Sequence, residues 1–494
     1  MDKNKKKRKI GIKLPVYFLS LFVVALISVG LTYWLVTNGL FQTNPIARTN
    51  PESKQPITEI KNVEGFQNIE AVYEIILSNY IENVDEKDLI EGALSGMVSA
   101  VQDPYSQYLN IDESENMNDT ISASFEGIGA EIMSMDDQIT IVSPIKGSPA
   151  EENGLLPNDI ILSADDVSLQ GMTATEAVTL IRGERGSTVT LEIKRGTQVF
   201  TVDIVRDTIP IETVGFHLDE NDDKIGVVAV YNFARPTYQE IVDAVQELRT
   251  QGAEKFVFDF RQNPGGLLDQ ALKIANMFVE DGAILLQTEE KGSEPYIIQA
   301  SDQEYGAFQI KEPAVMLIDE GSASASEIVA GVMKEEAEVP LVGTTSFGKG
   351  TVQSIYPLTA KSELKLTVAK WLTPEGNWIH DEGIEPDYKV NLPDYAFLTL
   401  IDTSETYELG AVSEAVSNVE EILEAVGYAV TADGYLDYDT VAAIEQFQVD
   451  NQLKPSGVLD DETARVLTEE LREVIQDNDT QYAKAIEVLE GLSE

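Results

Sequence analysis

A serine and a lysine 25 positions apart are the residues of this chain best suited to covalent chemistry. Ser324 follows an apolar run at residues 314–318 that has the length of a buried strand, and it precedes residues 326–337, whose apolar spacing is helical. A strand-to-helix turn exposes a side chain and directs the next backbone amides outward, where they stabilise negative charge. The pattern therefore predicts Ser324 as a nucleophile, with the Ala325 N–H beside it as an oxyanion donor.

A serine hydroxyl needs a neighbouring base, and Lys349 in the segment FGKG is the best candidate. His217 and His380 are the only histidines, and neither has the sequence context of a known serine triad. At a reference pKa of about 10.4, only roughly one lysine in 2500 is neutral at pH 7, whereas burial lowers a lysine pKa by about 3 to 5 units. We therefore expect Lys349 in an apolar site. Gln353 would share its strand face if residues 350–355 are extended, and would orient the amine.

Other chemistries fit the composition less well. The chain has no cysteine, so thiol catalysis and disulfides are excluded, and with two histidines and no HExxH a zinc peptidase is not expected. Residues 343–350 read GxxxxGKG, but the hydroxyl residue that follows the lysine of a P-loop is missing and no helical pattern comes next. We expect neither a cofactor nor a metal.

These motifs resemble the carboxy-terminal processing proteases, which are serine peptidases with a Ser-Lys dyad and an inserted PDZ domain. The matching segments are GSASASEI at residues 321–328, FGKGTVQ at 347–353, DFRQNPGG at 259–266 and DPYSQYL at 103–109. The similarity spans about residues 62–394. It implies a crotonase-like α/β core with Ser324 as nucleophile, Lys349 as general base, Gln353 as its orienting partner, and an oxyanion hole formed by Ala325 and one glycine of the pair Gly265 and Gly266.

Residues 124–208 are similar to a PDZ domain, on the segments FEGIGAEI and GSPAEENGLLPNDII and a helix expected at Ala174–Ile181. A PDZ domain binds an extended peptide along a strand edge and its carboxylate at backbone amides. The resemblance places that loop at Gly127, Ile128, Gly129 and Ala130. Arg182, directly after the helix, would sense the bound peptide and couple it to the active site.

The N-terminus predicts a membrane anchor. Residues 1–13 carry seven Lys or Arg and one Asp, and residues 14–36 carry no charge. At 1.5 Å per residue this apolar segment would span about 34 Å, enough to cross a bilayer. The lysines place the N-terminus in the cytoplasm and the catalytic domains outside. A cleaved signal peptide is the alternative, and residues 37–61 read as a linker.

The rest of the chain is strongly acidic, since the net charge is −50 although the first segment is basic. Such a charge argues against nucleic acid as a partner. Residues 62–123 contain two amphipathic helical patterns. In similar proteases this segment helps to pair subunits, so we expect a homodimer. Residues 209–400 would form the protease core.

Residues 412–476 predict three amphipathic helices joined by DG and SG turns, and they resemble a peptidoglycan-binding module. A docking or dimerisation bundle is the alternative. Residues 477–494 have a helical and acidic pattern, and we expect them to form a solvated tail. The whole chain is thus interpreted as a multidomain α/β, membrane-anchored, extracytoplasmic serine endopeptidase that recognises flexible C-terminal tails. The competing hypothesis is a catalytically silent scaffold that tethers envelope proteins to the wall.

Overall fold

The computed structural model describes residues 64–135, 137–358, 361–399, 401 and 407–492. The chain divides into two units, Met1–Val84 and Asp85–Glu494. The described part of the first unit contains helix α2 (Glu64–Asn79). The predicted membrane segment at residues 14–36 and the linker at 37–61 lie outside the described residues. Among the helices that are described, none is long and apolar enough to cross a bilayer.

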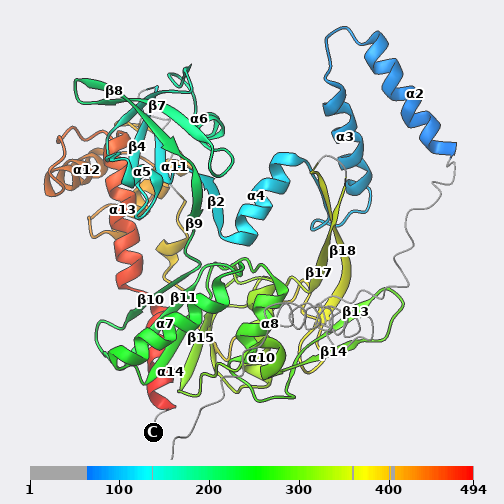
Figure 1. Ribbon diagram of the computed structural model, residues 1–494. Helices are drawn as coiled ribbons and strands as arrows, with labels where there is room; N and C mark the ends of the chain where they lie inside the picture. Colours follow the sequence, from blue (N-terminus) through cyan, green and yellow to red (C-terminus); the bar gives the residue numbers. More distant parts are fainter. Residues whose placement is uncertain (1–63, 136, 359–360, 400, 402–406, 493–494) are drawn as a thin grey trace, which may run out of the picture. The chain divides into compact units, whose positions relative to one another are not determined.

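The core of the second unit is a six-stranded sheet in the order β10-β11-β12-β15-β16-β19. Figure 1 labels β10, β11 and β15 of this sheet. All neighbouring strands are parallel except β10, which pairs antiparallel with β11. The central strands β12 and β15 are nearly continuous apolar runs, as expected where both faces of a sheet are covered. The strand bounds are Val214–Leu218 for β10, Ile225–Val230 for β11, Lys255–Asp259 for β12, Ala314–Ile318 for β15, Leu341–Gly343 for β16 and Tyr388–Lys389 for β19.

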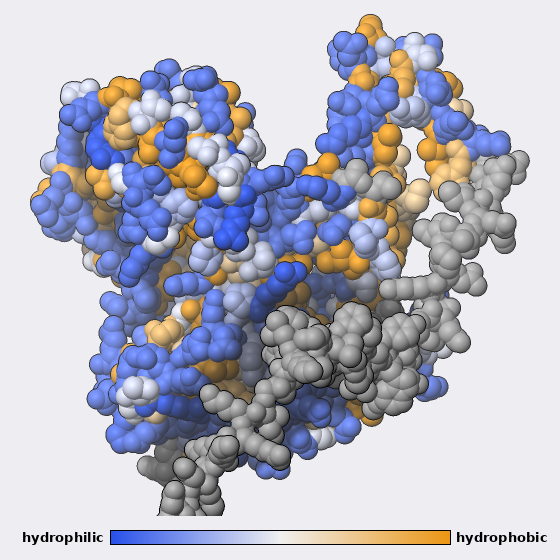
Figure 2. Space-filling model, viewed as in Figure 1, coloured by the Kyte–Doolittle hydropathy of each residue, from blue (hydrophilic) through white to orange (hydrophobic). Residues whose placement is uncertain are grey.

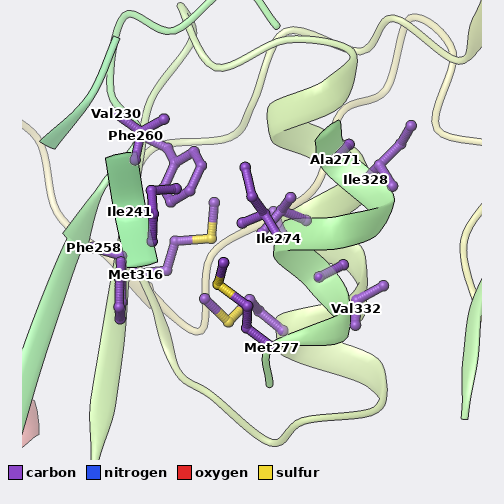
Figure 3. Packing of buried hydrophobic residues seen from close by; sticks show 14 of the residues in the cluster. Val230, Ile241, Phe258, Phe260, Ala271, Ile274, Met277, Met316, Ile328 and Val332 are labelled. Carbon is purple, nitrogen blue, oxygen red and sulfur yellow. The ribbon is translucent and has the colours of Figure 1, made fainter. Parts of the chain in front are cut away.

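One face of this sheet packs against α7 (Thr237–Gln251), α8 (Leu268–Asn276) and α10 (Ala325–Glu335). Side chains that alternate along the strands supply the core, and Figure 3 shows Phe260 and Met316 on the strand side with Ile274 and Ile328 on the helices. The β15–α10 connection is the predicted strand-to-helix turn.

The opposite face is covered by α14 (Thr480–Gly491). Ala485 and Leu489 are fully buried there, against a cluster that includes Val257 and Leu317. The prediction of a solvated tail at residues 477–494 was therefore wrong. The segment has five acidic residues, but its apolar residues recur at helical spacing and bury one stripe of the helix.

A second sheet joins β1 (Gln107–Leu109), β17 (Thr351–Pro357), β18 (Glu363–Leu372), β13 (Ile284–Glu290) and β14 (Tyr296–Gln299). All its pairings are antiparallel. The pairing of β17 with β18 contains a bulge between Val352 and Gln353, which interrupts the simple alternation of side chains. Two helices lie on either side of β1 in sequence, α3 (Glu86–Ser99) and α4 (Ile111–Ser122).

The inserted domain has the predicted helix α6 (Ala174–Ile181) and a sheet in the order β3-β4-β5-β7-β8. Its strands are Ala130–Met135, Gln138–Pro144, Ile160–Ala164, Thr188–Arg195 and Gln198–Val205. The paired strands β2 (Ser124–Gly127) and β9 (Asp207–Pro210) connect it to the rest of the unit.

The C-terminal module contains the three predicted helices, α11 (Glu414–Ala425), α12 (Tyr438–Asp450) and α13 (Asp461–Asp477). They enclose their own apolar core, in which Leu423, Ile444, Phe447 and Leu467 are fully buried.

Candidate active site

Three loops meet where the parallel strands β12, β15 and β16 end. They comprise residues 260–267, 319–324 and 344–350. The carboxyl ends of parallel strands share one edge of a sheet, which is the usual place for ligands in α/β folds. The segments DFRQNPGG, GSASASEI and FGKGTVQ are therefore brought together by the topology.

Ser324 occupies the turn between β15 and α10 and is partly exposed. Its backbone has φ 54° and ψ −107°, a conformation that residues other than glycine rarely adopt. Such strain costs about 1 to 3 kcal/mol and collects at functional sites, where the surrounding structure maintains it. The turn thus presents the serine side chain at the N-terminus of α10.

The glycine pair lies directly against this serine. A side chain at Gly265 would clash with the carbonyl oxygen of Ala323 and with the Cβ atom of Ser324. The Gly265 N–H donates to Asn263 Oδ1 at 2.9 Å. By contrast, the N–H groups of Gly266 and Ala325 donate to no other residue in the described part of the chain. Two unsatisfied amides therefore remain close to Ser324.

Lys349 is partly buried, and its Nζ atom lies 5.0 Å from the centre of the Tyr105 ring. Across the described ranges, this ammonium group has no ion pair and no hydrogen bond. Burial is the main cause that lowers the pKa of Lys349, and the positive charge of Lys365 adds to it. The charges of Glu327 and Asp103 act in the opposite direction but do not reverse the shift.

Glu327 connects the serine and lysine loops, and the sequence reasoning missed it. Its carboxylate is fully buried. Oε2 accepts the backbone N–H of Ser324 at 2.7 Å and that of Lys349 at 2.9 Å, so these two nitrogens lie no farther apart than the sum of the two distances. Oε1 accepts the Gly348 N–H at 2.6 Å and the Ser346 hydroxyl at 2.7 Å. The available signal was a glutamate three residues after a helix-capping serine.

An open pocket of about 620 Å³ adjoins these loops. Apolar groups of Tyr105, Pro264, Ala323 and Phe347 line it. Gln262, Glu320, Gly321 and Lys349 complete the lining. A pocket of this size beside Ser324 can accept side chains of an extended peptide.

Gln353 follows Lys349 by four residues in the sequence, and His380 contacts the neighbouring Gly350. Neither side chain is hydrogen-bonded to the Lys349 amine. The Gln353 side-chain amide donates to the hydroxyls of Thr351 at 3.0 Å and Thr367 at 3.2 Å. His380 Nδ1 accepts the Gly350 N–H at 3.3 Å, so this histidine contacts the backbone next to the lysine.

In the inserted domain, residues 127–129 are buried and Ala130 is half-buried, and the N–H groups of Ile128 and Gly129 donate to no described residue. Arg182 lies beside this loop. Its guanidinium is 4.5 Å from the centre of the Phe125 ring and 3.0 Å from the Asp119 carboxylate on α4.

Comparison with known proteins agrees with this organisation. The model of peptidase family S41 matches residues 224–390, a PDZ domain model matches 140–195, a peptidoglycan binding domain model matches 412–467, and the N-terminal domain of the activating protease CtpB matches 25–113. The carboxy-terminal processing protease CtpA of Bacillus subtilis is 39% identical over 478 residues, which cover 97% of this chain and 98% of the relative.

The chain belongs to the carboxy-terminal processing proteases of peptidase family S41. The protease CtpB of Bacillus subtilis is 38% identical, and the match covers 86% of this chain and 89% of CtpB. Among solved structures, the photosystem II D1 C-terminal processing protease is 26% identical with a TM-score of 0.38, and the match covers 66% of this chain and 93% of that one. As a member of the family, this carboxy-terminal processing protease is a serine-type peptidase with a PDZ domain and a C-terminal helical module.

The first prediction concerns Glu327. We expect Glu327→Gln to lower kcat/KM at least about 100-fold, because the amide retains one acceptor oxygen and turns its NH₂ group toward backbone donors, which displaces both loops. Glu327→Ala would also lower the free energy of unfolding by at least about 3 kcal/mol, since four donors lose their acceptor in the interior.

Both variants are to be assayed for peptidase activity and urea unfolding beside Glu336→Gln, which changes an exposed glutamate at the C-cap of the same helix. Activity of the Glu327→Gln protein within threefold of the parent chain would disprove the organising role of this carboxylate.

Proposed function

We propose that this protease cleaves peptide bonds with Ser324 as nucleophile and Lys349 as general base. The observation that carries the proposal is the shared acceptor, because one carboxylate oxygen of Glu327 binds the backbone N–H of both residues. The lowered pKa of Lys349 supports it further, since only a neutral amine can remove the serine proton. In acylation, the serine oxygen attacks the scissile carbonyl and Lys349 takes its proton. The ammonium then returns that proton to the leaving amine, and water hydrolyses the acyl-enzyme.

The negative oxygen of the tetrahedral intermediate would be stabilised by the N–H groups of Ala325 and Gly266. Both amides lack a partner among the described residues, whereas the Gly265 N–H is already bound to Asn263. Gly265 would instead serve by its lack of a side chain, which lets the loop lie against Ser324. Fixed amide donors of this kind are worth about 2.7 to 4 kcal/mol of transition-state stabilisation each.

Gln353 is the proposed orienting partner of Lys349. In the described structure its amide nitrogen is held by two threonine hydroxyls, Thr351 and Thr367. These contacts would fix the side chain with its carbonyl oxygen available to the lysine amine. Lys349, whose amine lies over the Tyr105 ring in the described structure, would move to accept this orientation.

Substrate recognition would begin at the PDZ domain, with a flexible C-terminal tail whose carboxylate binds the N–H groups of Ile128 and Gly129. Binding of the tail would be coupled to catalysis through Arg182, which forms an ion pair with Asp119 on α4. The same helix accepts the Arg235 N–H at the Ile121 carbonyl, at 2.9 Å.

The segment that contains Arg235 also reaches the oxyanion loop. Phe233 donates its N–H to the Gly265 carbonyl at 2.9 Å and accepts the Leu267 N–H at 2.7 Å. A shift of α4 would therefore move a backbone segment that is hydrogen-bonded on both sides of Gly266. This contiguous set of bonds supports the coupling proposal.

In the cell, the uncharged segment at residues 14–36 would anchor the enzyme in the membrane with its catalytic domains outside, and the C-terminal module would contact peptidoglycan. Its substrates would then be envelope proteins or peptides. Recovery of the enzyme in the soluble fraction after cell lysis would contradict this location. So would digestion of its catalytic domains by an added protease only after the cells are lysed.

We also propose a homodimer formed through the N-terminal helices. Figure 2 shows apolar side chains at the surface of α2 and of α3. The exposed apolar residues include Phe66, Val72 and Ile75 on α2, and Ile90 and Met97 on α3. Burial of such a surface against a second copy would remove it from water. A monomer in sedimentation equilibrium across the accessible concentration range would contradict the dimer.

The second prediction tests the dyad. Ser324→Ala and Lys349→Arg are each expected to reduce kcat at least about 1000-fold, the first by removing the nucleophile and the second because a guanidinium cannot give up its proton at neutral pH. Turnover of fluorescein-labelled casein measures the effect, with Lys361→Arg as the control at an exposed lysine of the β17–β18 hairpin. Substantial activity in Lys349→Arg would eliminate the lysine-base mechanism.

The third prediction tests the coupling through the PDZ domain. Arg182→Ala should reduce cleavage of a substrate with a free apolar C-terminus several-fold, because the contact with Asp119 is lost. Cleavage of the same substrate with an amidated C-terminus should change little, since it lacks the carboxylate that the loop would bind. Arg185→Ala, which alters another arginine of the domain paired with Asp207, is the control. Equal rates for Arg182→Ala and the parent chain on both substrates would refute the coupling.

A further inference from the structure

Arg261 stands between the central sheet and the oxyanion loop. It follows β12 in the segment DFRQNPGG and is largely buried. Its Nη2 lies 2.7 Å from Asp259 Oδ2. Its Nη1 reaches the C-terminal segment, at 2.7 Å from Asp479 Oδ2 and 3.1 Å from Gln481 Oε1. The guanidinium is thus held between a strand of the core and residues that follow it by more than 200 positions.

Asp479 is itself firmly positioned. It lies between α13, the last helix of the C-terminal module, and α14, and its Oδ1 accepts the Tyr482 N–H at 2.8 Å as the N-cap of α14. The Tyr482 hydroxyl donates to Asp219 at 2.7 Å, and Gln481 donates to the Val390 carbonyl at 3.0 Å. Together with the buried apolar stripe of α14, these bonds fix the carboxylate relative to the sheet.

The residues after Arg261 are bonded to the serine loop. The backbone N–H and the side-chain amide of Gln262 both donate to the Asp319 carboxylate, each at 2.8 Å. The Asn263 carbonyl accepts the Ala323 N–H at 3.0 Å and the Ser326 hydroxyl at 2.9 Å. Arg261 thus directly precedes the residues that join the loop of Gly265 and Gly266 to the serine loop.

We propose that Asp479 is a positioning residue for peptide hydrolysis, which holds Arg261 so that the Gly266 amide stays aligned with Ser324. This inference rests on the proposed oxyanion hole. The C-terminal segment would then contribute to peptide hydrolysis. More than 80 residues, including the three-helix module, lie between β19, the last strand of the core sheet, and Asp479. Because only Asn478 and Asp479 lie between α13 and α14, the module is attached directly at this contact.

The test is steady-state hydrolysis of fluorescein-labelled casein by the full-length chain with Asp479→Asn. Asparagine caps a helix about as well as aspartate, so α14 keeps its N-cap while Arg261 loses a charged partner. We expect kcat to fall about 10-fold or more with KM within about twofold, because misaligned oxyanion donors weaken transition-state binding alone. Asp479→Glu, which retains the charge, should restore most of kcat.

Asp477→Asn changes an exposed aspartate two residues away and serves as the matched control. The proposal is overturned if Asp479→Asn retains kcat within twofold, or if its loss of activity follows a loss of thermal stability and is not restored by Asp479→Glu. Ser324→Ala is measured in parallel. An active parent chain whose Ser324→Ala form is equally active would overturn the proposed function itself, whereas an inactive Ser324→Ala form with a fully active Asp479→Asn form would overturn only the role of Asp479.

Discussion

A single buried carboxylate holds together the loops that carry Ser324 and Lys349, the proposed nucleophile and base. Glu327 lies in the first turn of α10, and its oxygens accept four hydrogen bonds from the loops that carry Ser324 and Lys349. A buried carboxylate without such donors would be costly, and donors without the carboxylate would be equally unsatisfied. The charge and the two loops therefore stabilise one another, and the unusual backbone angles of Ser324 are maintained by this arrangement.

Local patterns were sufficient to predict most of the elements that position the site. The strand β15 and the helix α6 have the bounds expected from apolar spacing and turn residues, because each buries a continuous run or stripe. The role of α14 was not predicted, since an acidic composition does not reveal that Ala485 and Leu489 face a sheet formed by distant residues. Periodicity identifies a stripe but not the surface that covers it.

The same distinction holds within the site. The residue types and spacing predicted Ser324 and Lys349, and the family resemblance added the glycine pair. The alternation rule used for Gln353 does not account for the bulge beside it. Glu327 was overlooked because its function depends on a loop 19 to 22 residues later that folds back over the helix start. Among the residues that the structure describes, the Gly265 N–H is bonded to the Asn263 side chain and the Gly266 N–H has no partner, which is likewise a property of the tertiary structure.

The account depends on a neutral Lys349 amine, and the pH dependence of kcat/KM for casein hydrolysis tests this most directly when the parent chain is compared with Lys365→Gln. The charge of Lys365 contributes to the lowered pKa of Lys349, so its removal raises that pKa. Activity should increase with pH as the amine loses its proton, and in Lys365→Gln this increase should occur at higher pH, while Lys361→Gln leaves it in place. An increase at the same pH in all three proteins would contradict the assignment of Lys349 as the base.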